Sequence, residues 1–126
     1  MKLVKLSALA APPWVLEIPG IPARPGAKHW RVIHKQKGEW KIQVKQLMRS
    51  LRIPACQPGE RRIVAITFHR PGVLSDKDNA YAQAKIPLDA CTFAGLIEDD
   101  RPACIDLHVT TKSSGKSFTR IVIEQA

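Results

Sequence analysis

Two groups of acidic residues stand out in a basic chain. The segment SDKDN (75–79) places Asp76 and Asp78 two residues apart, and EDD (98–100) follows later. In extended backbone, residues i and i+2 point the same way, so Asp76 and Asp78 can present their carboxylates together. If EDD returns beside them, each carboxylate pair about 4 Å apart repels by about 4 kcal/mol at an effective dielectric near 20. Such a cluster must either be protonated or bind a cation.

Carboxylate oxygens are hard ligands that suit Mg²⁺, with Mn²⁺ as a possible substitute. A cation there would turn a cluster that repels phosphate into one that binds and polarises it and activates a water. Lys85, between the two acidic groups, could stabilise charge developing at phosphorus. Alternatively, the aspartates are ordinary turn and cap residues and Lys85 is a solvated lysine. Spacing alone leaves both interpretations open.

The overall charge favours a polyanionic partner. Across 126 residues there are 20 Lys and Arg against 11 Asp and Glu, a net charge of +9. Such a balance is typical of proteins that bind nucleic acid or an anionic membrane surface. The first 75 residues contain only three acids, Glu17, Glu39 and Glu60. The basic surface and the acidic cluster therefore occupy different parts of the chain.

Length and hydropathy indicate one domain, residues 1–126, with no membrane span. Three cysteines without CxxC spacing predict free thiols in a reducing cytoplasm and no zinc site. The apolar stretch near the N-terminus is interrupted by Lys5 and ended by Pro12, so it is too short for a signal peptide.

The elements expected around these residues form an α+β domain. Alternation predicts strands over 14–18 and 61–70, with Val64, Ile66 and Phe68 on one face. An apolar stripe predicts a helix over 38–53. Its lysines and arginines form another face, which is either solvated or in contact with phosphate. The basic segment 19–38 is predicted to be a loop.

The second half of the chain supplies the rest. A helix is expected over 79–93, capped by Asp78 or Asn79 and ended by Gly95. Pro87 should either kink it or mark a second helical start. Strands over 104–111 and 117–124 are expected to form a hairpin through KSSGK. The predicted order is β-α-β-α-β-β, one small mixed sheet packed against helices.

Basic residues near the predicted loop and turn are candidates for contact with DNA. Trp30 either stacks on a nucleic acid or pins the loop to the core. The residues predicted to bind the DNA backbone are Arg24, Lys28, Arg31, Lys35, Arg70 and Lys77.

The segment SDKDNAYAQAKIPLDACTFAGLIEDD, 75–100, resembles the RusA family of Holliday junction resolvases. The family pattern combines DxDN, a helical lysine, an Asp-Ala pair, a glycine and a final Asp-Asp. The resemblance implies a Mg²⁺-dependent endonuclease that acts as a homodimer on four-way DNA junctions in recombination and repair. It implies that Asp76, Asp78 and Asp100 are the catalytic and metal-binding residues, with Lys85 in support.

Two departures from that pattern keep other functions open. The stretch between Asn79 and Lys85 is longer than in the family, and Pro87 lies in the helix that carries the lysine. The chain could therefore be a non-catalytic nucleic-acid-binding protein of the same fold. It could also be a metal-dependent nuclease for flaps or single strands.

Overall fold

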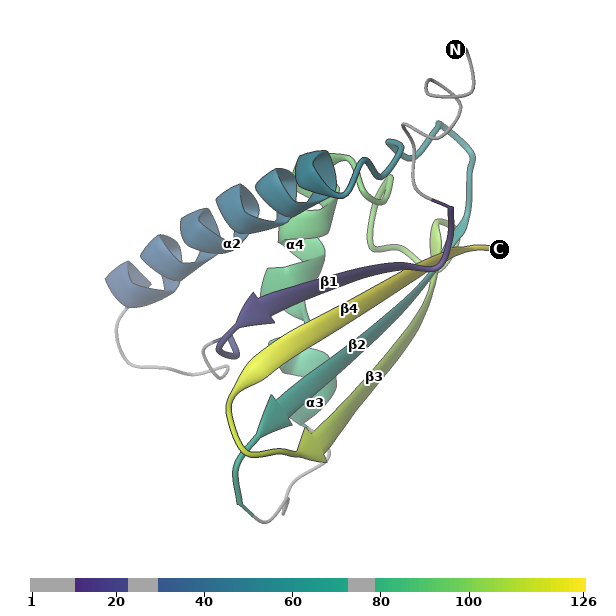
Figure 1. The fold of residues 1–126 in the computed structure, drawn as a ribbon. Helices are drawn as coiled ribbons and strands as arrows, with labels where there is room; N and C mark the ends of the chain where they lie inside the picture. The colour runs from purple at the N-terminus through teal and green to yellow at the C-terminus, as the bar shows by residue number, and fades with distance from the viewer. Residues whose placement is uncertain (1–10, 23–29, 73–78) are drawn as a thin grey trace.

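The computed structural model describes residues 11–22, 30–72 and 79–126. It contains one four-stranded mixed sheet with helices gathered on one side, which confirms the predicted α+β class (Figure 1). The strands are β1 (Trp14–Pro19), β2 (Arg62–Arg70), β3 (Ile105–Ser113) and β4 (Phe118–Gln125). The helices are α2 (Trp30–Ser50), α3 (Asn79–Gln83) and α4 (Lys85–Ala94).

Strict alternation builds the buried face of the sheet. Val64, Ile66 and Phe68 of β2 all point into the core, as predicted, and are at most 1% exposed. Neighbouring β4 places Ile123 opposite Val64 and Ile121 opposite Ile66. The helices cover this face, so the sheet provides a rigid floor for the segments that follow β2 and α4.

The predicted hairpin between the last two strands is wrong. The sheet order is β1-β4-β2-β3, so β2 lies between β3 and β4. The Ser114 N–H donates to the Arg70 carbonyl at 2.9 Å, because the connection crosses the end of β2. Strand β2 is apolar along its whole buried face and hydrogen-bonds on both edges, pairing parallel with β3 and antiparallel with β4. A parallel pair requires a crossover, which α3 and α4 provide.

Helix α2 begins eight residues earlier than the predicted helix, so Arg31 and Lys35 lie on a helix and not in a loop. Gly38 and the proline-rich sequence upstream favoured a loop, since glycine costs about 1 kcal/mol in a helix interior. The buried stripe of the helix begins at Trp40 and continues through Val44 to Met48, so the turns before Gly38 extend beyond it. Arg31 and Lys35 are exposed.

The helix predicted over 79–93 is two helices. Helix α3 ends at Gln83, and α4 starts at Lys85 after Ala84. Pro87 lies in the first turn of α4, where a missing N–H breaks no helical hydrogen bond. Gly95 ends α4 in the left-handed conformation, at φ 84°, as predicted. The break fixes where Lys85 emerges.

Candidate active-site groove

A groove of about 620 Å³ lies between α2 and α4 and is bounded by the residues after α4. Its walls combine cationic, acidic and aromatic side chains. The residues that line it are His34, Lys37, Gly38, Lys41, Lys85, Asp89, Thr92, Phe93, Asp99 and Asp100. Two residues proposed from the sequence, Lys85 and Asp100, therefore lie in the same groove.

Lys85 is held between two carboxylates. Its Nζ lies 3.4 Å from Asp100 Oδ2 and 3.5 Å from Asp89 Oδ1, one helical turn ahead on α4. Asp89, and next Asp100, raise the pKa of Lys85 because both favour the charged ammonium. The Lys85 side chain is 64% exposed, so these ion pairs contribute little to stability. Their effect is to aim a charged lysine into the groove.

The three acids of EDD have different partners. Glu98 accepts a hydrogen bond from the Gly59 N–H at 3.1 Å and ties two loops together. Asp99 accepts from the Asp100 N–H at 2.8 Å and pairs with Arg101 at 2.8 Å, and these contacts lower its pKa in that order. Asp100 is the member whose carboxylate contacts Lys85. EDD is therefore not a uniform acidic cluster.

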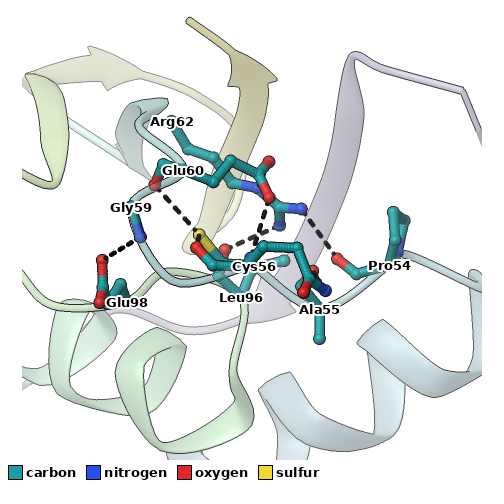
Figure 2. Close-up of polar contacts among 9 residues, drawn as sticks. Pro54, Ala55, Cys56, Gly59, Glu60, Arg62, Leu96 and Glu98 are labelled. Carbon is teal, nitrogen blue, oxygen red and sulfur yellow. Dashed lines mark hydrogen bonds and ion pairs between the residues drawn. The ribbon is translucent and has the colours of Figure 1, made fainter.

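A buried arginine fixes the chain leading to Asp100. The Arg62 side chain is 1% exposed and donates to the carbonyls of Leu96 at 2.9 Å and Pro54 at 3.0 Å (Figure 2). It also pairs with Glu60 at 2.8 Å, and its guanidinium lies 4.8 Å from the Trp14 ring centroid. Figure 2 shows the contacts of Arg62 with Glu60, Leu96 and Pro54 converging where the loop after α2 meets the loop after α4. We call Arg62 and its three oxygen partners the Arg62 clamp.

This clamp was not predicted from the sequence. One signal was available, because alternation along β2 places Arg62 on the same buried face as Val64. An arginine on a core face needs several acceptors, since a buried charge without partners is costly. Those acceptors lie up to 34 residues away in the chain, at Leu96. Sequence spacing therefore predicts the requirement but not the partners.

A row of basic residues on α2 runs beside the groove. Lys41 and Lys45 place their Nζ atoms 5.4 Å and 5.5 Å from the ring centroid of Phe93 on α4. On one side of this pair, Lys37 lines the groove. On the other side, Arg49 and Arg52 line a neighbouring hollow together with Lys45. The basic helix face predicted from the sequence therefore continues along both hollows.

Several predicted residues cannot be placed. Asp76, Asp78, Arg24, Lys28 and Lys77 lie outside the described residues. Of the remaining DNA-contact candidates, Arg31, Lys35 and Arg70 do not line the groove. The α2 lysines that do line it, Lys37 and Lys41, were missed as site residues, although Lys41 belonged to the predicted helix face.

Comparisons with known proteins add no assignment. No protein-family model matches the chain, and no curated protein matches it significantly. Within residues 11–22, 30–72 and 79–126, no three His, Cys, Asp or Glu side chains come close enough to hold a metal ion. In the same ranges, no helix is both long and apolar enough to cross a membrane.

Proposed function

We propose that the protein is a metal-dependent endodeoxyribonuclease that cleaves branched DNA, with four-way junctions as substrate and a homodimer as the active form. The observation that carries the proposal is the contact of Lys85 with Asp100 in a groove bordered by lysines of α2. The resemblance of residues 75–100 to the RusA family supports the same activity.

Each described residue has a role in this proposal. Lys85 is the cation that stabilises negative charge developing on the phosphate, since a preorganised charge is most effective there. Lys37 and Lys41 attract and align the DNA backbone along the groove. Asp100 orients Lys85 and offers a partly exposed carboxylate.

The donor chemistry fits a hard divalent cation. Asp100 contributes one oxygen ligand of the type that Mg²⁺ and Mn²⁺ prefer, and Asp76 and Asp78 are the proposed remaining ligands. When bound, the cation would polarise the phosphate and lower the pKa of a water. Lys85 is long and exposed, so it can leave Asp100 without disturbing the core.

A two-fold dimer suits a four-way junction, because resolution requires cuts on two strands and the symmetry supplies two equivalent sites. We place the activity in the reducing cytoplasm, where the three free cysteines would stay reduced. Sedimentation of the protein with and without a junction tests the dimer. A species that stays monomeric on the junction would contradict it.

The decisive experiment is cleavage of an end-labelled four-way junction in Mg²⁺, with EDTA as the metal-free arm. Asp100→Asn should abolish cleavage while junction binding survives. Asp106→Asn is the matched control, because Asp106 is a partly exposed aspartate on β3 that lies 3.4 Å from His108 and does not line the groove. Equal cleavage by the Asp100 variant and the parent would refute the assignment.

A non-catalytic junction-binding protein is the second candidate. The observation that favours it is the pairing of Lys85 with two carboxylates, which offsets the charge that a phosphate would meet. Tight junction binding without any product in Mg²⁺ or Mn²⁺ would select this alternative. Faster cutting of flaps or single strands than of junctions would instead assign a different nuclease substrate.

A further inference from the structure

Phe93 is an exposed aromatic ring at the end of α4. It is 55% exposed, whereas Leu88 and Cys91 of the same helix are buried in the core. The ammonium groups of Lys41 and Lys45 both lie over its ring, 5.4 Å and 5.5 Å from the centroid. Packing does not account for this position, since an exposed phenyl ring gains little from burial.

The arrangement matches the chemistry of an unpaired nucleotide. Nucleobases stack on aromatic side chains whatever their sequence, and nearby lysines neutralise the phosphates on either side. A paired base inside a duplex has both faces covered by its neighbours and cannot stack on a protein ring. An exposed ring beside two lysines therefore selects single-stranded DNA over duplex DNA.

We propose that Phe93 is a stacking platform for an unpaired DNA base, with Lys41 and Lys45 binding the adjacent phosphates. This inference rests on the proposed function, and it names the DNA feature that the groove takes: a strand opened at a branch point. Phe93 and Lys85 line the same groove from one helix. Eight residues separate them, which is about 12 Å along the axis.

That separation has a consequence for specificity. Bases stacked in a duplex strand are about 3.4 Å apart, so 12 Å exceeds three stacked steps. The base on Phe93 is thus about three nucleotides away from the phosphate at Lys85 and is not the nucleotide that carries it. Phe93 would act as a specificity residue that registers strand opening beside the cut.

The test is binding of fluorescein-labelled oligo-dT and of a duplex of equal length, measured by anisotropy in EDTA so that no cleavage interferes. Phe93→Ala should weaken binding of the single strand by about 5- to 150-fold, the range for loss of one base–aromatic stack. Duplex affinity should change by less than about twofold, because only phosphate contacts remain. Phe93→Trp should restore single-strand binding.

Ile42→Ala is the control, since Ile42 is a comparably exposed apolar residue of α2 that does not line the groove. It should leave both affinities unchanged. Equal losses on single strand and duplex, or no loss on either, would overturn the platform. So would a shift of Phe93→Ala to a smaller oligomer in sedimentation with single-strand affinity unchanged, because Phe93 would then be a subunit contact.

Cleavage separates this inference from the proposed function. If the parent protein cuts no DNA in Mg²⁺ but binds single strands through Phe93, the nuclease fails and the platform stands. If the parent cuts junctions but Phe93→Ala binds single strands normally, the platform fails and the nuclease stands.

Discussion

Removing Arg62 should destabilise the protein more than removing any exposed arginine. In Arg62→Ala, Glu60 loses its charged partner at 2.8 Å and the carbonyls of Leu96 and Pro54 lose their donors. Breaking a buried ion pair by removing one partner costs about 3–5 kcal/mol. Against a typical free energy of unfolding of about 5–15 kcal/mol, that loss is large.

The assay is urea unfolding followed by circular dichroism, and the matched control is Arg61→Ala. Arg61 is exposed, and among the described residues its side chain donates long hydrogen bonds, at 3.3–3.4 Å, to the carbonyls of Pro102 and Ile105. It should cost less than about 1 kcal/mol, as for most surface substitutions. If both variants lose the same stability, the clamp does not hold the two loops together.

A milder variant probes the segment before Asp100. Arg62→Lys keeps a positive charge but cannot donate in two directions from one planar group. The fold should survive, while the amides of Leu96 and Ile97 should exchange with deuterium faster than in the parent. Unchanged exchange there, with normal global stability, would show that the Leu96 carbonyl needs no guanidinium to stay in place.

Three further outcomes are expected. The Gln57 N–H, and then Arg62, lower the pKa of Glu60, so its stabilisation is present at neutral pH and lost as the pH falls below about 4.5; Glu60→Gln should flatten this acid limb in urea melts. Burial raises the pKa of Cys91 to about 12, so its thiol should stay unreactive toward Ellman's reagent at pH 8 until the protein unfolds. Lys41→Ala should weaken DNA binding and reduce the slope of log affinity against log salt by about one, whereas an unchanged slope would remove Lys41 from the phosphate contacts.

Local patterns predicted the elements but not all their neighbours. The period of two in β2 fixed which face Val64, Ile66 and Phe68 bury, because one sheet face is covered by helices. The same alternation in the last two strands could not reveal that β2 separates them. Strand order depends on which edges gain most from pairing, and that comparison involves the whole sheet. The helix predicted for α2 was also too short, because Gly38 disfavours a helix interior.

The candidate site, too, was predicted from the sequence only in part. Lys85 and Asp100 were each proposed as site residues from the family-like pattern, but their contact was not predicted. The separation of Asp100 from Glu98 could not be predicted either, because Glu98 is committed to the Gly59 N–H, 39 residues away. Adjacent acids look equivalent in a sequence and differ only through such partners. Nothing in the spacing tells the aspartate that lines the groove from the glutamate that binds the Gly59 loop.

Under the proposed function, the groove accommodates both the acids and a DNA backbone in a basic protein. Lys85 lies between Asp89 and Asp100, so the three side chains together carry one net negative charge, while the row on α2 remains positive. A phosphate backbone that approached along α2 would first be attracted by the lysines of α2. It would reach Asp89 and Asp100 only on the α4 side of the groove. A cation that displaces Lys85 from Asp100 would reverse the sign of that side and free the ammonium for the phosphate. Metal binding and substrate binding should therefore strengthen each other, since each removes a repulsion that the other would otherwise face.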